Sequence, residues 1–315
     1  MTPRTAKLKA FAKLNLGLRV LYKRPDGYHE LRTVFQTISL ADRLDVTFER
    51  ARETRIEIEG TPEIPDNLVG KAARLVLEDL EIHASVVFRL RKRIPAGAGL
   101  GGGSSDAAAV LLALPVLAGE NLAPERLAGL AAQLGSDVPF FLHGGTALGL
   151  GRGEELYPLP DRGATRRGAT RALLIVPDVH SSTAEAYEEL SPRLTSIALQ
   201  NKLVGFQQEV WQPVGVAGVN DFEETMFALH PQLRRIKDRL RRCGADPAAM
   251  TGSGSAIFGI FQDQDHLERA KKQLASERIF AISFVSRPHY RAAWRRALKL
   301  HTKGDLWPPR SRYAR

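Results

Sequence analysis

The residues with the clearest chemical potential form a glycine-rich run, Pro-Ala-Gly-Ala-Gly-Leu-Gly-Gly-Gly-Ser-Ser-Asp, at positions 95–106. Without side chains, the backbone N–H groups of such a loop can approach a ligand closely. The Ala- and Leu-rich stretch that follows predicts a helix over 104–118, and we expect Ser104 and Ser105 to cap it. Glycines that lead into a helix start are typical of a phosphate site, so a nucleotide is the predicted ligand.

Two familiar nucleotide loops are poor matches to this run. No Lys-Ser/Thr pair closes it, which excludes the usual Walker-type loop. Gly97, Gly99 and Gly102 fit the dinucleotide pattern G-x-G-x-x-G, but residues 86–93 before them carry arginines at alternate positions. That alternation predicts a strand of an antiparallel sheet with one wet face, not the buried first strand of a Rossmann unit. The remaining alternative is a flexible glycine linker.

Segment 12–16, Ala-Lys-Leu-Asn-Leu, places a lysine and an asparagine two residues apart. On a strand, Lys13 and Asn15 would share one face. A lysine beside an amide can neutralise and orient an anionic substrate. An ordinary solvent-exposed strand face is the alternative.

Segment 26–30, Asp-Gly-Tyr-His-Glu, predicts a turn that presents an aromatic ring and an imidazole together. Tyr28 offers a stacking surface, and His29 offers donor and acceptor nitrogens, a combination that suits a planar heterocycle. The alternative is a hairpin with an ordinary packed tyrosine.

Segment 134–141, Leu-Gly-Ser-Asp-Val-Pro-Phe-Phe, sets an aspartate between a glycine and an apolar run. Partly desolvated and near a cation, Asp137 could take a proton from a hydroxyl as that hydroxyl attacks phosphorus. A capping aspartate in a loop is the alternative.

A second glycine-rich turn, Thr-Gly-Ser-Gly-Ser-Ala at 251–256, precedes an apolar strand. It could close against the first loop or steady the phosphates of a substrate. Such turns are common, so this one is weak evidence by itself.

The elements that must position these segments follow from periodicity and turn residues. Asn67 is expected to cap a helix that runs to Leu80, and Pro124 to begin one that runs to Leu134. Because strands and helices mix without a parallel rhythm, we predict an α+β fold with two lobes. The other expected strands lie at 8–22, 31–40, 44–49, 54–59, 172–176, 256–262 and 278–286, and the other expected helices at 183–190, 231–242 and 264–275.

Composition places the 315-residue chain among ordinary globular proteins, with 43% hydrophobic and 25% charged residues. No run is apolar enough to span a bilayer, and residues 1–9 lack the core of a secretion signal. Cys243 is the only cysteine, which excludes a disulfide framework and a cysteine zinc site. We therefore expect a cytoplasmic protein.

The net charge of +10 is concentrated at the C-terminus. Residues 287–315 hold nine Arg and Lys against the single acid Asp305, a charge of +8, so the rest carries only about +2. A solvated or loosely packed basic tail is expected there. Contact with RNA, an anionic lipid or a partner is the alternative.

Taken in order, segments 12–16, 26–29, 101–105, 134–139 and 251–254 resemble the motifs of the GHMP kinase superfamily, whose signature is a Pro-x-Gly-x-Gly-Leu-Gly-Ser/Gly-Ser-Ser/Gly-Ala-type loop. The resemblance spans about residues 8–286. It is greatest for the members that phosphorylate a cytidine-diphosphate-linked methylerythritol in the non-mevalonate route to isoprenoids. Homoserine, mevalonate and galactose kinases lack the Tyr28-His29 pair after Asp-Gly.

The resemblance implies a two-lobed kinase fold, with a ribosomal-S5-like N-terminal lobe at 1–155 and a ferredoxin-like α/β C-terminal lobe at 170–286, followed by the tail 287–315. The Arg-rich stretch 162–168 is longer and more basic than the family pattern.

The resemblance also implies an ATP-dependent transfer of a phosphoryl group to the 2-hydroxyl of that substrate. Asp137 would act as the base, and Lys13 would stabilise negative charge beside it. Tyr28 and His29 would recognise cytosine, Tyr187 would stack on its other face, and Asn15 would position the erythritol or diphosphate. ATP would be held by Pro95, Ala96, Gly97, Ala98, Gly99, Leu100, Gly101, Gly102, Gly103, Ser104 and Ser105.

Mg²⁺ should accompany ATP, with ligands that the sequence leaves unknown. The partner is expected to be this small molecule, with no membrane or nucleic acid, for a monomer or a homodimer. The rival readings are another GHMP small-molecule kinase, or an RNA-binding protein that uses the basic tail.

Overall fold

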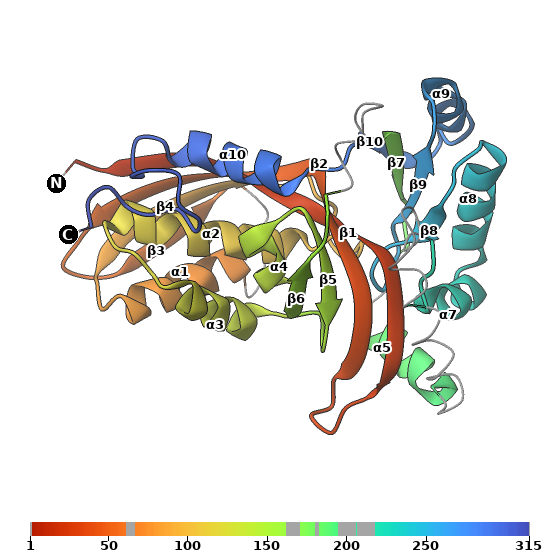
Figure 1. Cartoon of the computed structure of the whole chain (residues 1–315), viewed down its shortest axis with the longest axis horizontal. Coiled ribbons are helices and arrows are strands. Elements are labelled where there is room, and N and C mark those ends of the chain that lie inside the picture. The colour runs from red at the N-terminus through yellow and green to blue at the C-terminus, as the bar shows by residue number, and fades with distance from the viewer. Residues whose placement is uncertain are drawn as a thin grey trace.

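Two lobes, each built on its own sheet, make up the structure (Figure 1). Both mix strands with helices, which confirms the α+β class. The computed structural model describes residues 2–60, 67–161, 171–179, 183–194, 206 and 218–314. The Arg-rich stretch 162–168 therefore lies outside the described residues. Among those described, no helix is long and apolar enough to cross a membrane.

A long antiparallel hairpin of β1 (Arg4–Lys23) and β2 (His29–Arg50) runs through the first lobe. The second half of β2 pairs antiparallel with β4 (Ala84–Arg91), which pairs parallel with β3 (Arg55–Glu59). The antiparallel neighbour predicted for the arginine-bearing strand is confirmed. Alternate residues of β4 are buried, so its arginines lie on the opposite, wetter face.

Strand β2 is continuous where the sequence predicts two strands, at 31–40 and 44–49. The polar residue between them, Asp42, is fully buried without breaking the strand. Its Oδ1 accepts hydrogen bonds from the backbone N–H groups of Arg93 (2.5 Å) and Ile94 (2.8 Å), and its Oδ2 accepts one from Lys92 Nζ. These partners follow β4, so the residues next to Asp42 give no sign of them.

Beyond the first half of β2, the sheet continues with two further strands. β5 (Thr146–Leu150) pairs antiparallel with β2, and β6 (Glu155–Pro158) pairs antiparallel with β5. The first sheet therefore continues to Pro158. The lobe boundaries drawn from the sequence stay a prediction.

The first lobe also contains the helices α1 (Leu68–Asp79), α2 (Gly102–Ala118), α3 (Pro124–Leu134) and α4 (Val138–His143). The predicted cap of α1 is confirmed, since Asn67 Oδ1 accepts from Val69 N at 3.0 Å. Pro124 is also at its predicted place, the first position of α3.

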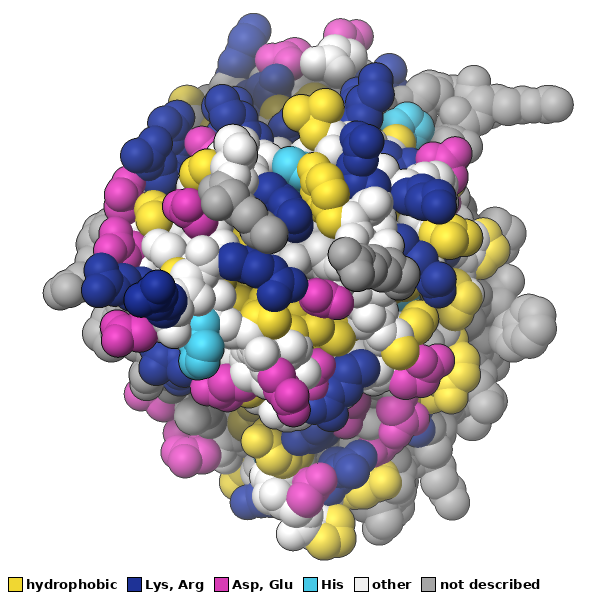
Figure 2. All heavy atoms as spheres, turned by 90° about the vertical axis from the view of Figure 1, so that its left-hand side faces the viewer, with side chains coloured by type: hydrophobic (Ala, Val, Ile, Leu, Met, Phe, Trp, Pro, Cys, Tyr) yellow, Lys and Arg dark blue, Asp and Glu magenta, His cyan; other side chains and the backbone are white. Residues whose placement is uncertain are grey.

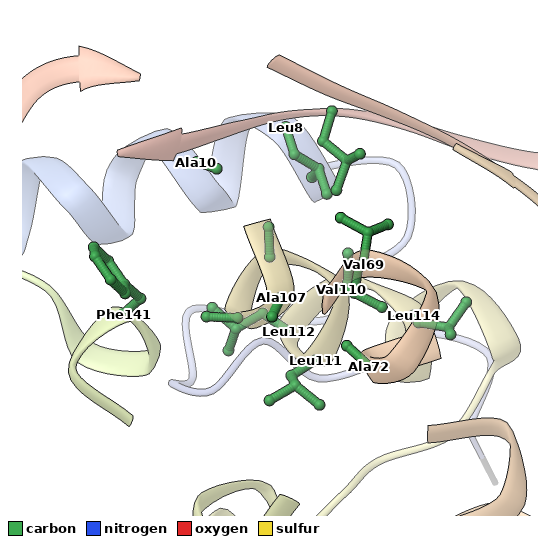
Figure 3. Packing of buried hydrophobic residues seen from close by; sticks show 14 of the residues in the cluster. Leu8, Ala10, Val69, Ala72, Ala107, Val110, Leu111, Leu112, Leu114 and Phe141 are labelled. Carbon is green, nitrogen blue, oxygen red and sulfur yellow. The ribbon is translucent and has the colours of Figure 1, made fainter. Parts of the chain in front are cut away.

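Helix α2 lies at the centre of the first lobe. It is apolar on all sides, and all its residues from Ser105 to Ala118 are buried, as such a helix requires. Figure 3 shows its side chains packed between Leu8 and Ala10 of β1 and Val69 and Ala72 of α1. The glycine-rich loop is thus attached to a helix that the core holds on every side.

The start of α2 corrects the prediction that Ser104 and Ser105 cap it. The helix begins two residues earlier, and the N-cap residue is Gly101, with φ of +67°. Glycine adopts this left-handed conformation without steric cost, so the chain can turn into the helix upstream of the serines. The Ser105 hydroxyl instead donates to the carbonyl of Phe11 at 2.7 Å.

The second lobe has an antiparallel sheet in the order β10–β7–β9–β8. After β10, the expected strand to residue 286 ends early, because Phe284 bridges to Ile38 of β2 in the first lobe. The strands are β7 (Arg171–Val176), β8 (Ala248–Met250), β9 (Ile257–Phe261) and β10 (Arg278–Ile282). The helices are α5 (Thr183–Leu190), the 3₁₀ turn η1 (Ser191–Arg193), α7 (Phe222–Leu229), α8 (Pro231–Arg242) and α9 (Gln264–Gln273).

The C-terminal segment is folded against the first lobe, so the prediction of a loosely packed tail is wrong. Helix α10 (Arg287–Leu298) lies along β1, with Tyr290, Trp294 and Leu298 buried (Figure 1). These residues recur every fourth position and form an apolar stripe. Beyond the helix, Trp307 Nε1 donates to the carbonyl of Leu142 at 3.0 Å.

On the face that carries both termini (Figure 2), Lys and Arg side chains do not form one continuous patch. Figure 2 shows Lys and Arg side chains on this face interspersed with Asp and Glu. An uninterrupted basic surface is the usual footprint of a nucleic-acid site. This face therefore gives the RNA-binding alternative no support.

We expect Trp294→Ala to lower the free energy of unfolding by about 3–5 kcal/mol, because it removes a buried indole from the packed face of α10. Urea denaturation of the full chain measures this. Arg296→Ala, on the exposed side of the same helix, is the control and should stay within about 0.5 kcal/mol of wild type. Equal effects of the two substitutions would contradict the packed arrangement.

Candidate active site

A cleft of about 960 Å³ gathers nearly all the residues singled out in the sequence. Both lobes contribute to its wall. The predicted site residues that line the cleft are Lys13, Asn15, Tyr28, His29, residues 95–104, Asp137 and Tyr187. Ser105 is the exception, since it is buried beneath the loop and bonded to Phe11.

The two glycine-rich turns touch each other in this cleft. A Cβ on Gly99 would lie 2.4 Å from the carbonyl oxygen of Thr251, so no other residue fits there without movement. Gly99 also has φ of +74°. This contact joins the loop of the first lobe to the second lobe, and it confirms that the second turn closes against the first.

The loop presents backbone rather than side chains to the cleft. Gly97 has φ of +68°, and a Cβ there would meet nothing within 4 Å, so the space above it is open. The first N–H groups of α2 lack helical partners by construction. Open space at Gly97, in the same cleft as the first residues of α2, fits a phosphate group.

Lys13 and Asp137 form an ion pair beside this loop. Lys13 Nζ lies 3.3 Å from Asp137 Oδ2, and the Asp137 side chain is 32% exposed while that of Lys13 is 4% exposed. Asp137 occupies the N-cap position of α4, but its side chain makes no capping bond. The alternative of a capping aspartate is therefore wrong, and one side of the carboxylate is open to the cleft.

Asn15 holds the other side of the lysine. Lys13 Nζ donates to Asn15 Oδ1 at 2.5 Å, and Asn15 Nδ2 donates to Thr33 Oγ1 at 2.7 Å. Lys13 and Asn15 share one face of β1 as predicted, but both are buried, so the alternative of a wet strand face is wrong. Thr33 was missed, because nothing beside it in the sequence links it to a residue 18 positions away.

Three aromatic side chains, Tyr28, His29 and Tyr187, line the cleft and are called the ring cluster below. The His29 and Tyr187 rings stack with centroids 4.6 Å apart and planes at 21°. Tyr28 is 54% exposed, with the Arg152 guanidinium 4.7 Å above its ring. The alternative of an ordinary packed Tyr28 is wrong, because the residue is more than half exposed.

The imidazole of His29 is held by Ser191, which the sequence did not single out. The two are 2.8 Å apart, and the Ser191 hydroxyl donates to the carbonyl of Tyr187 at 2.7 Å. Ser191 therefore accepts from His29 Nε2–H, which leaves Nδ1 with a lone pair. Burial, and then the charge of Lys23, lower the pKa of His29, so the ring is neutral at neutral pH. Burial, and then the charge of Asp137, raise the pKa of Tyr187.

A buried cluster that the sequence did not predict anchors the start of the glycine-rich loop. Lys92 Nζ donates to Asp42, and to Asp106 Oδ2 at 2.7 Å. Burial raises the pKa of Asp106 to about 7, which Asp42 reinforces and Lys92 opposes. Burial lowers the pKa of Lys92, but Asp106 and Asp42 outweigh it and raise the value overall. Lys92 ends the basic strand, so the sequence favours a solvated side chain there.

A divalent metal would find few protein ligands here. Among the described residues, no group of three or more His, Cys, Asp or Glu side chains could hold one. Asp137 and Ser104 offer oxygen atoms that suit Mg²⁺ at the cleft. An ion held mainly by nucleotide phosphates and water fits these residues.

Family comparisons agree with this arrangement. The GHMP kinases N terminal domain matches residues 67–145, and the GHMP kinases C terminal domain matches residues 203–279. A homoserine kinase from Cytophaga hutchinsonii, 19% identical with a TM-score of 0.67 over 90% of this chain and 95% of its own, shares the fold.

Nearer relatives carry one name. The 4-diphosphocytidyl-2-C-methyl-D-erythritol kinase of Solibacter usitatus (strain Ellin6076) is 53% identical over 99% of both chains. That of Geobacillus thermodenitrificans (strain NG80-2) is 36% identical over 90% of this chain and 98% of its own. A crystal structure of 4-(cytidine 5'-diphospho)-2C-methyl-D-erythritol kinase is 38% identical, with a TM-score of 0.71 over 88% of this chain and 98% of its own.

The Solibacter similarity extends over the C-terminal segment, so the expectation that residues 287–315 lie outside the family pattern is wrong for that relative. The glycine-rich loop, the buried lysine and the aspartate beside it line one cleft in a chain of which these enzymes cover 88–99%. The chain belongs to the GHMP kinases and, within them, to the 4-diphosphocytidyl-2-C-methyl-D-erythritol kinases.

Proposed function

We propose that the protein transfers the γ-phosphoryl group of ATP to the 2-hydroxyl of 4-diphosphocytidyl-2-C-methyl-D-erythritol, a step in the non-mevalonate route to isoprenoid precursors. The observation that carries this proposal is the Lys13–Asp137 pair at 3.3 Å, in one cleft with the glycine-rich loop and the ring cluster. The glycine-rich loop suits a triphosphate, and the ring cluster suits a nucleobase. The cytoplasmic location expected from the sequence stays a prediction.

In this proposal Asp137 is the general base. Its carboxylate takes the proton from the acceptor hydroxyl as that oxygen attacks the γ-phosphorus and ADP leaves. Lys13, with its ammonium held by Asn15, stabilises negative charge beside the reacting oxygens. The hydroxyl must enter on the exposed side of Asp137, since Lys13 covers the other.

The backbone of residues 95–104 would hold the phosphates of ATP at the start of α2, whereas Ser105, expected there too, is buried and its N–H donates to the Gly101 carbonyl. Mg²⁺ would be held by those phosphates together with Asp137 or Ser104, and it would neutralise part of the phosphate charge. Phosphate binding of this kind uses backbone N–H groups, so the loop glycines need no side chains for it. Their value is the open backbone at Gly97 and the close contact at Gly99.

The ring cluster would recognise the cytosine. Tyr28 supplies an exposed aromatic side chain, and the Tyr187 ring stacks on the imidazole of His29. With Nε2–H committed to Ser191, the neutral imidazole offers Nδ1 as an acceptor, which complements the exocyclic amino group of cytosine. The carbonyl of uracil at the same place would face that lone pair and be disfavoured.

We expect Asp137→Asn to lower kcat about 10²–10⁴-fold, because asparagine cannot take the proton. ADP release by the purified protein, with ATP and the cytidine substrate, measures this. Asp265→Asn, an exposed change in the first turn of α9, is the control and should leave kcat unchanged. An Asp137→Asn enzyme with more than about a tenth of wild-type kcat would exclude Asp137 as the base.

We expect His29→Ala to raise KM for the cytidine substrate about tenfold while kcat changes little, because it removes one acceptor and part of a stacked wall. Initial rates at saturating ATP measure both constants. His83→Ala, at an exposed position before β4, serves as the control. A fall in kcat at unchanged KM would show that His29 acts on the chemistry instead.

A further inference from the structure

We propose that Thr33 is a positioning residue for catalysis. Its hydroxyl sets the orientation of the Asn15 amide, and that amide in turn aims the Lys13 ammonium at Asp137. The inference rests on the proposed roles of Lys13 and Asp137. It adds a residue on β2 that touches neither ATP nor acceptor in that proposal.

Thr33 lies fully buried at the point where three strands meet. It pairs with Leu18 on β1 and with Gly149 on β5. Gly149 has no side chain, and a Cβ there would lie 3.1 Å from the Thr33 methyl carbon. The methyl group therefore fills this space together with the Phe35 ring, which would lie 2.6 Å from the same Cβ. Because the side chain is β-branched, the placement of the methyl group also fixes the direction of the hydroxyl.

A bulge in β1 brings the partners of this hydroxyl within reach. The register of β1 against β2 shifts between Asn15 and Gly17. Thr33 Oγ1 donates to the Gly17 carbonyl at 2.8 Å, and Asn15 Nδ2 donates to Thr33 Oγ1 at 2.7 Å. Both bonds are buried, so water does not replace them.

The polarity of this chain of hydrogen bonds has one solution. A carbonyl can only accept, so the single proton of the Thr33 hydroxyl goes to Gly17. The oxygen of Thr33 can then only accept, so Asn15 must turn its amino group toward it. An ammonium can only donate, so Lys13 requires the amide oxygen of Asn15, and that is the atom it meets at 2.5 Å.

Three further contacts hold the same lysine and asparagine. The backbone N–H of Lys13 donates to the Leu100 carbonyl at 3.0 Å, and that of Asn15 donates to Thr251 Oγ1 at 2.8 Å. The Phe35 ring centroid lies 5.4 Å from Lys13 Nζ. None of these contacts selects between the two orientations of the Asn15 amide. Among the contacts named here, only the hydrogen bond to Thr33 fixes the orientation of the Asn15 amide from the side opposite Lys13.

The test compares Thr33→Val, which keeps the shape but removes the hydroxyl, with Thr33→Ser, which keeps the hydroxyl. We expect Thr33→Val to lower kcat about 10- to 100-fold with KM for ATP and for the acceptor unchanged, and Thr33→Ser to stay within about threefold of wild type. The kcat–pH profile of Thr33→Val should also change shape, because the Lys13–Asp137 contact is loosened.

A double-mutant cycle with Asn15→Ala separates positioning from simple destabilisation. If Thr33 acts through Asn15, Thr33→Val should change kcat less than about twofold in the Asn15→Ala background. Equal losses in both backgrounds, equal losses for Val and Ser, or a raised KM at unchanged kcat would overturn the proposal.

Folding is checked by circular dichroism and thermal denaturation, and Thr33→Ala replaces Thr33→Val, with the same criteria, if the latter does not fold. Wild type and Asp137→Asn are assayed alongside. An inactive wild type, or an active Asp137→Asn, contradicts the proposed function. A normal Thr33→Val beside an inactive Asp137→Asn contradicts only the role of Thr33.

Discussion

The central constraint in this structure is the burial of a lysine ammonium. A buried charge is costly unless it is paired and fully hydrogen-bonded. Lys13 is paired with Asp137 at the start of α4 and donates a hydrogen bond to Asn15 of its own strand. The cation in turn holds the carboxylate at the cleft that the glycine-rich loop lines. Three features of the fold position this ion pair: the β1–β2 hairpin, the bulge at Asn15–Gly17 and the start of α4.

The same support makes the site depend on both lobes. Thr251 of the second lobe accepts from the backbone of Asn15 and packs on Gly99 of the loop. The glycine-rich loop, strand β1 and the second lobe therefore meet at one point. The contacts of His29 also cross the lobes, because Tyr187 and Ser191 belong to the second. A change in how the lobes sit would therefore affect the loop, Lys13 and His29 together.

Much of the site could be predicted from local sequence patterns. Strand alternation puts Lys13 and Asn15 on one face, and glycine spacing marks the loop. Contacts across the sheet could not be predicted that way. Two such contacts depend on strand register. One is the bulge that brings Gly17 to Thr33, and the other is the set of hydrogen bonds that Asp42 accepts from the segment after β4. The packing of α10 could have been predicted, because Tyr290, Trp294 and Leu298 form a helical stripe that the net charge of the segment obscures.

The most direct test of the central claim is ³¹P NMR of the reaction product formed from ATP and 4-diphosphocytidyl-2-C-methyl-D-erythritol. If Lys13 and Asp137 form the reaction centre, wild type should yield ADP and one new phosphomonoester signal, assigned to the 2-hydroxyl by its coupling pattern. Lys13→Met and Asp137→Asn should yield neither over the same period. A phosphomonoester at another hydroxyl, or its unchanged formation by both variants, would contradict the account.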